Sequence, residues 1–252
     1  DFVIQTSGVT LSGGGIVSLS NTTANRFIAS VSDTPLINFN ITLRGAGQIG
    51  SNNLQIDNRA AGIIEANLSQ PLIVDPSAAG LTNAGVLRAV SGATLRLENV
   101  SFTNTTGGTI SAAASSIVQV GNASIIGGEL TSTSTGRFRT SGAATLSGIK
   151  LTAGSVWNAP DNTTTTLVGT IDNRGTFEIS SGGNATDLKI DSSGATLTGN
   201  GIVTLSNSTN NRILGIAAST SFVNENNRIS GAGQLGVNLL ALDNRSSGII
   251  EA

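Results

Sequence analysis

The carboxylates are the residues that could do acid–base or metal chemistry here, because the 252-residue chain contains no His and no Cys. Cleavage of a glycosidic bond needs two carboxyl groups close together, and a calcium site needs several oxygen ligands at one point. The acids occur singly instead, at Asp33, Glu65, Asp75, Glu98, Glu129, Asp161, Asp172, Glu178, Asp187 and Asp191. We therefore expect no catalytic residue and no enzymatic activity.

Three Asp-Asn-Arg triplets form the most distinctive polar motif, at residues 57–59, 172–174 and 243–245. Their side-chain oxygens could bind calcium. However, an Arg two residues after each Asp would repel a cation, and the glycine-rich nonapeptide of calcium-loaded β-rolls is absent. The motif favours a structural corner over a metal site, and we expect neither a metal nor a cofactor.

A glycine follows each triplet, and shorter Asn-x-Gly versions lie between the copies. A sharp corner needs backbone with φ > 0, which Gly adopts freely and Asn tolerates. If the chain stacks in coils, corner asparagines of successive coils can hydrogen-bond as a ladder, while Asp and Arg serve solubility and register at the outer edge. The predicted corner residues are Asp57, Asn58, Arg59, Gly62, Asn83, Gly85, Asn104, Gly108, Asp172, Asn173, Arg174, Gly175, Asp243, Asn244, Arg245 and Gly248.

The spacing of these corners predicts the fold. Glycine-to-glycine steps of about 23 residues separate Gly62, Gly85 and Gly108, and short alternating β-branched strands lie between the corners. Apolar residues never keep a helical period. The sequence predicts an all-β, single-stranded β-solenoid (parallel β-helix) of about 20–25 residues per coil and about eleven coils, on the order of 50 Å long.

A second, longer repeat divides the chain. Residues 1–66 align with residues 187–252 at a constant offset of 186 without a gap, and about half of the positions are identical. We interpret residues 1–252 as one continuous β-solenoid, in which 1–186 is a first large repeat unit and 187–252 is the start of a second copy. The pattern begins directly at Asp1 and stops in mid-unit at Ala252, which indicates a piece of a longer fibre.

Asn-X-Ser/Thr sequons are frequent, as expected of a chain rich in Asn, Ser and Thr. They are glycan sites only if the host glycosylates exported proteins. The candidate attachment residues are Asn21, Asn99, Asn122, Asn162, Asn184 and Asn207.

The single Trp, Trp157, has two readings. It could stack on a carbohydrate, but its alternation with Val156 and the turn signal after it favour a half-buried core or rim aromatic. The run Thr163–Thr166 does not recur at the coil period, so it does not predict an ice-binding face.

The overall charge excludes one class of partner. The formal net charge is −2 and no basic run concentrates positive charge, so we expect no nucleic-acid binding. No apolar run approaches the length of a membrane span, so we expect a chain that does not cross a membrane.

Two coil sequences resemble a known group. Asn83-Ala84-Gly85-Val86-Leu87-Arg88-Ala89 and residues 171–179 are similar to the passenger and stalk repeats of large bacterial surface adhesins, of the autotransporter and filamentous-haemagglutinin-like type. The resemblance implies a secreted or cell-surface fibre with adhesive or scaffolding roles, and it supplies no catalytic residue.

The function expected from these features is a structural or adhesive solenoid segment of an extracellular fibre. Its partners would be itself, stacked end to end or laterally, together with surface glycans or the surfaces of host or neighbouring cells. End-to-end stacking would use the apolar strands at residues 2–4 and 248–250, which we expect to be open sheet edges. The alternative is a carbohydrate-binding or carbohydrate-active parallel β-helix protein.

Overall fold

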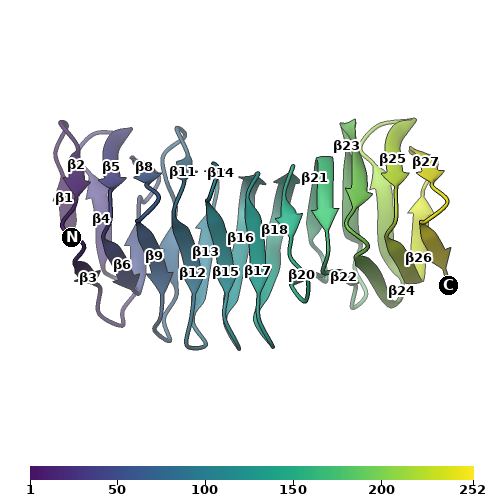
Figure 1. Cartoon of the computed structure of the whole chain (residues 1–252), viewed down its shortest axis with the longest axis horizontal. Helices are drawn as coiled ribbons and strands as arrows, with labels where there is room; N and C mark the ends of the chain where they lie inside the picture. Colours follow the sequence, from purple (N-terminus) through teal and green to yellow (C-terminus); the bar gives the residue numbers. More distant parts are fainter.

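The computed structural model describes all of residues 1–252, and its 28 strands form one parallel sheet wound into an elongated solenoid (Figure 1). The predicted fold class is confirmed: the chain is all-β, with about 11 turns of roughly 23 residues each. The two termini lie at opposite ends of the long axis (Figure 1). With no helix present, no segment of the structure qualifies as a membrane-spanning helix.

Each coil has three strand-bearing faces, which we name A, B and C in chain order. Face A carries β1 (Phe2–Ile4), β4 (Arg26–Ala29), β7 (Gly47–Ile49), β10 (Leu72–Val74), β13 (Thr94–Glu98), β20 (Val156–Pro160), β22 (Thr176–Ser180) and β28 (Ile249–Glu251). Face B carries β2 (Val9–Leu11), β5 (Thr34–Asn38), β8 (Leu54–Asn58), β11 (Leu81–Asn83) and β14 (Ser101–Asn104). Face C carries β3 (Ile16–Ser18), β6 (Thr42–Gly45), β9 (Ile63–Ala66), β12 (Val86–Ala89), β15 (Thr109–Ala112), β17 (Glu129–Ser132), β19 (Lys150–Leu151), β25 (Thr220–Asn224) and β27 (Leu240–Asn244).

Six longer strands bend around a corner and so lie on two faces each. β16 (Ile117–Ile126), β18 (Arg137–Ser147), β24 (Ile202–Gly215) and β26 (Arg228–Gly236) run from face A to face B, whereas β21 (Thr164–Asn173) and β23 (Thr186–Thr198) run from face B to face C. Register shifts within their ladders, as between Gly121 and Ala123, mark the bends.

The core is a set of stacked apolar columns, because alternate residues of each strand point inward. In β5, for example, Leu36 is buried between two partly exposed neighbours and pairs with Val9 of one adjacent coil and Ile56 of the other. Burying such a side chain stabilises the fold by about 1.5–3 kcal/mol. The buried apolar residues form one cluster from Ile4 to Ile229, so the solenoid has a single continuous core.

Trp157 lies inside this core and is fully buried. Its ring stacks on Phe138, with centroids 5.9 Å apart, and packs at 6.4 Å against Phe177 on the other side. Its indole N–H donates to the hydroxyl oxygens of Thr140 and Thr165, each at 3.2 Å. The prediction that Trp157 is a core aromatic is confirmed, but its burial is complete and not half, because aromatic neighbours in both adjacent coils cover the ring. Trp157 therefore offers no face on which a sugar could stack.

The offset of 186 residues is reproduced in the strand pairing. Pairs in residues 1–66 recur between the corresponding residues of 187–252: Phe2–Phe27 as Leu188–Ile213, Val9–Leu36 as Ala195–Phe222, Ile16–Thr42 as Ile202–Arg228, Thr34–Leu54 as Thr220–Leu240, and Thr42–Ile63 as Arg228–Ile249. The two stretches consequently share one coil geometry as well as similar sequences.

Candidate functional site

The predicted asparagine corner carries a continuous series of side-chain hydrogen bonds from coil to coil. At the end of face B, the amide nitrogen of each asparagine donates to the amide oxygen of the next: Asn38 to Asn58 at 2.8 Å, Asn58 to Asn83 at 2.7 Å, and Asn83 to Asn104 at 2.8 Å. All four side chains, which we call the asparagine ladder, are buried. The hydrogen bonds expected between corner asparagines are present, and they extend to Asn38, which the sequence pattern missed.

Ladder asparagines also fasten their own corners. Asn38 donates to the carbonyl oxygen of Ile41 and accepts from its backbone N–H, both at 2.9 Å, and Asn58 donates to the carbonyl of Gly62 at 3.2 Å. A buried amide without partners would cost about 1–3 kcal/mol. The ladder meets this need while it joins successive coils.

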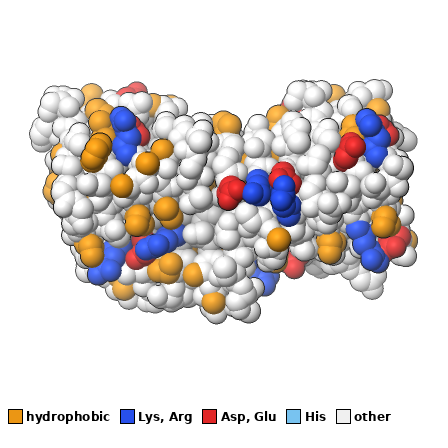
Figure 2. Space-filling view, in the orientation of Figure 1, with side chains coloured by type: hydrophobic (Ala, Val, Ile, Leu, Met, Phe, Trp, Pro, Cys, Tyr) orange, Lys and Arg blue, Asp and Glu red, His pale blue; other side chains and the backbone are white.

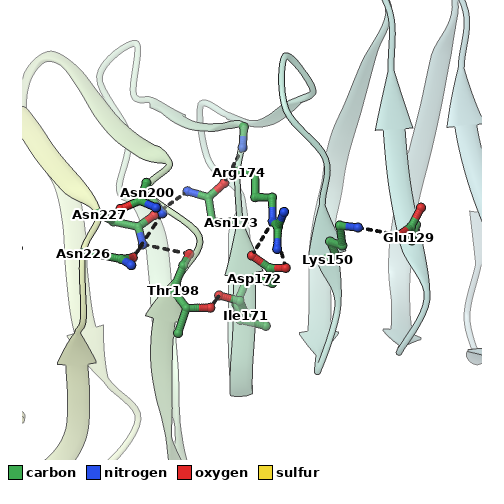
Figure 3. Close-up of polar contacts among 11 residues, drawn as sticks. Glu129, Lys150, Ile171, Asp172, Asn173, Arg174, Thr198, Asn200, Asn226 and Asn227 are labelled. Carbon is green, nitrogen blue, oxygen red and sulfur yellow. Dashed lines mark hydrogen bonds and ion pairs between the residues drawn. The ribbon is translucent and has the colours of Figure 1, made fainter.

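A second set of asparagines lies at the end of face C (Figure 3). Asn173 donates to the amide oxygen of Asn227, and Asn224 donates to that of Asn244, both at 2.8 Å. The backbone N–H of Asn227 donates to the Asn224 side chain at 3.0 Å, which links the two pairs. Asn58 and Asn244, equivalent in the 186-residue repeat, thus stand at different corners.

Glycine is required at the corners because there is no room for a Cβ atom, and not because the backbone adopts positive φ. None of Gly62, Gly85, Gly108, Gly175 and Gly248 has positive φ, and neither do the ladder asparagines, so the predicted φ > 0 at these positions is wrong. A Cβ on Gly85 would instead lie 2.2 Å from the Gly62 carbonyl oxygen and 2.4 Å from that of Arg59. The preceding coil approaches too closely for any side chain.

The charges of the Asp-Asn-Arg triplets neutralise each other. The Arg side chain contacts the Asp of its own triplet, at 2.5 Å for Arg59 and Asp57, 3.0 Å for Arg174 and Asp172, and 2.6 Å for Arg245 and Asp243. The hydrogen bond with Asp172 raises the pKa of the Arg174 guanidinium. Each arginine is about half exposed, so solvent screens these ion pairs and they contribute little to stability. The triplet arginines thus occupy the carboxylates that a cation would need.

Other carboxylates are also distributed among separate partners. Glu65 pairs with Arg88, Glu129 with Lys150 at 2.6 Å (Figure 3), and buried Asp187 with Arg212 at 2.7 Å. On the face shown in Figure 2, positive and negative side chains lie together in small mixed groups and form no patch of one sign. No three His, Cys, Asp or Glu residues gather in a metal-binding group.

Three hollows have volumes of about 290 Å³ or more, and none is lined by two carboxylates; one of them, at residues 122–124 and 143–145, has no acid at all. The first, of about 290 Å³ at the C-terminal end, is lined by apolar residues such as Ile229, Leu235 and Ile250, with Glu251 as its only acid. The second, of about 520 Å³, lies where the asparagine ladder ends and is lined by Asn104, the Thr and Gly residues that follow it, and Glu129. None of the three provides the two carboxyl groups of a glycosidase.

All six candidate glycan-attachment residues are exposed. The side-chain nitrogens of Asn21, Asn99 and Asn184 already donate hydrogen bonds, to Ser69, Asp75 and Asp161 respectively. The side chains of the remaining three, Asn122, Asn162 and Asn207, make no hydrogen bond. Attachment of a glycan there would therefore break no side-chain hydrogen bond.

Asp161 fastens the loop after β22. Its carboxylate accepts from the backbone N–H groups of Gly182 at 2.7 Å and Asn184 at 2.9 Å, and from the Asn184 amide at 2.7 Å. The side-chain hydrogen bond from Asn184, followed by the backbone bonds, lowers the pKa of Asp161 below its ordinary value of 3.8. No pattern in the sequence indicates this contact, because the partners of Asp161 lie in the next coil.

Comparisons of the chain with models of protein families, with characterised proteins and with solved structures found no match. The candidate function is accordingly argued from the geometry of this chain.

We predict that Asn83→Ala destabilises the fold by about 2–3 kcal/mol, because it leaves the buried Asn104 oxygen without its donor and removes the acceptor of Asn58. Asn83→Asp has the same shape, but its carboxylate cannot donate to Asn104. Asn83→Asp should therefore destabilise the fold more at pH 7 than in acid, where the protonated carboxyl group can donate to Asn104. Urea unfolding followed by circular dichroism measures both. The control is Asn207→Ala at an exposed position, whose free energy of unfolding should lie within about 0.5 kcal/mol of the parent value. If Asn83→Ala changed the free energy of unfolding no more than Asn207→Ala does, the role of the ladder would be contradicted.

We predict that the Gly182 amide resonance is constant between pH 5 and 8 and shifts with a midpoint below 3.8. A carboxylate with a lowered folded pKa stabilises above its unfolded pKa, and this stabilisation is lost as the pH falls through the folded value. Nuclear magnetic resonance titration measures the midpoint. Asp161→Asn should abolish the shift, whereas Asp191→Asn, at a carboxylate bonded within its own turn to Ser193, should preserve it. A midpoint at or above 3.8 would show that the contact does not hold the loop.

Proposed function

We propose that the chain is a structural, adhesive segment of a secreted or cell-surface fibre, in which coils stacked within and between chains build a rod. The observation that carries the proposal is the recurrence of the strand pairs of residues 1–66 in residues 187–252. A unit that repeats its pairing can be followed by another copy without a break in the sheet. The solenoid thereby extends by addition of units, as a fibre requires.

The lateral surface suits contact more than chemistry. Its carboxylates are engaged singly by arginines, lysines and loop amides, and the corner loops present hydroxyl and amide groups. Surface glycans and the surfaces of host or neighbouring cells are the partners we propose for these loops. No specific observation favours the carbohydrate-binding or carbohydrate-active alternative: each of the five hollows whose lining is described contains at most one acidic side chain, and the indole of Trp157 is buried.

The outer coils carry the surfaces for stacking between chains. At one end Phe2 and Val3 are about half exposed, and at the other Leu242, Ile249 and Ile250 are exposed. Strands β1 and β28 each pair on one side only. An apolar coil with unpaired backbone groups favours the addition of a further parallel coil, and we propose that such coils come either from further repeats of the same chain or from another chain stacked end to end.

We predict that the 252-residue chain self-associates with rising concentration and that Ile250→Lys abolishes this, because a buried lysine cannot be accommodated between stacked coils. Sedimentation velocity over a concentration series gives the association. The matched control is Ile202→Lys, since Ile202 is equally exposed, at 39%, but lies on the lateral surface in β24. A chain that stays monomeric at high concentration, or an equal effect of both substitutions, would overturn end-to-end stacking.

A further inference from the structure

The 186-residue unit does not contain a whole number of coils. On face B, inward residues can be followed from coil to coil through eight successive strand pairs. The column runs Val9, Leu36, Ile56, Leu81, Phe102, Ile125, Leu146, Leu167, Ile190. Ile190 therefore lies on face B, eight coils after Val9.

The equivalent of Ile190 in the first copy is Ile4, which lies on face A in β1. The same change of face occurs elsewhere. Val17 of β3 lies on face C, whereas its equivalent Val203 pairs with Phe177 of β22 on face A. One repeat unit thus advances the solenoid by eight coils and one additional face.

Corner loops at the two equivalent positions are held by the same set of side-chain hydrogen bonds. The loop of residues 19–26 is held by the Asn25 amide, and the loop of residues 205–212 by the Asn211 amide. Their donor bonds correspond one for one: Asn25 to the carbonyls of Ser20, Thr22 and Ala46 at 2.8, 3.4 and 3.2 Å, and Asn211 to those of Ser206, Ser208 and Ala232 at 2.7, 3.1 and 3.0 Å. The Arg26–Asp1 ion pair likewise recurs as Arg212–Asp187, both at 2.7 Å.

These two loops occupy different edges of the rod. The first connects β3 on face C to β4 on face A, and the second joins the part of β24 on face A to the part on face B. A unit of whole coils would instead align all copies along one edge.

We propose that successive 186-residue units present the same polar corner loop on successive edges of the fibre, each rotated by about a third of a turn. Three successive units would display the loop on all three edges of the rod. This display rests on the proposed function as a fibre of tandem units. The rotation itself is a property of the isolated chain.

The rotation can be measured with two labels. The chain has no native cysteine, so Thr23→Cys and Thr209→Cys, at exposed equivalent positions of the two loops, give two unique sites for maleimide–gold. Electron microscopy of the labelled rod should find the particles about a third of a turn apart around the axis. The control is Thr23→Cys with Thr133→Cys, since exposed Thr133 joins β17 on face C to β18 on face A and so shares the corner of Thr23. It measures the solenoid's own twist. Labels on one edge in both proteins would overturn the proposal.

Disulfide formation tests the same claim at the level of neighbouring strands. Thr204 pairs with Glu178, so Glu178→Cys with Thr204→Cys should cross-link on oxidation, because paired residues of adjacent parallel strands lie within disulfide reach. Asp172→Cys with Thr204→Cys should not, since Asp172 pairs with Thr198 on face C. The reverse result would mean that the unit contains whole coils. Neither readout requires adhesion or self-association, so failure of the proposed function leaves this inference separately testable.

Discussion

The spacing of about 4.8 Å between hydrogen-bonded strands is the constraint on which the rest of the structure depends. Every inward side chain must fit directly over its counterpart in the next coil. Leucine, isoleucine and valine meet this condition in thin layers, and the three large aromatics of the middle coils fit because they lie over one another. At the corners the same spacing leaves no room for a Cβ at Gly85 or Gly175, each of which would meet a carbonyl oxygen at 2.2 Å.

Two kinds of polar contact follow this stacking, and their energies differ. The ladder amides are buried, so a missing partner costs about 1–3 kcal/mol. The exposed Asp-Arg pairs of the triplets contribute much less, because solvent screens them. The ladder consequently fastens the corners of the core, while the triplet charges pair with each other at the surface. In the Asp-Asn-Arg triplet at residues 57–59, the central Asn58 therefore contributes most of the stabilisation. Asp57 and Arg59 contribute little.

Much of the fold was predictable, because coil length follows from the Gly62, Gly85 and Gly108 spacing and ladder formation follows from asparagine at matching positions. Three features were not. Asn38 lacks the glycine that marks the other corners, and Trp157 is buried because of aromatics about twenty residues away on either side. The corner glycines are required because another coil approaches too closely for a Cβ, and not because of positive φ. A fourth feature, the rotation of the repeat unit about the rod axis, could not be predicted from the sequence either. Sequence alignment equates Ile4 with Ile190 but contains no information on which face each occupies, since small differences in coil length accumulate over the unit.

The central claim is that each additional repeat unit lengthens the solenoid and leaves its cross-section unchanged. Small-angle X-ray scattering of the 252-residue chain and of a chain extended by one further 186-residue unit tests it most directly. Eight coils and one face at about 4.8 Å per coil should increase the maximum dimension by about 40 Å, with an unchanged cross-sectional radius of gyration. An increase in cross-section, or a maximum dimension that does not lengthen with the added unit, would contradict the account.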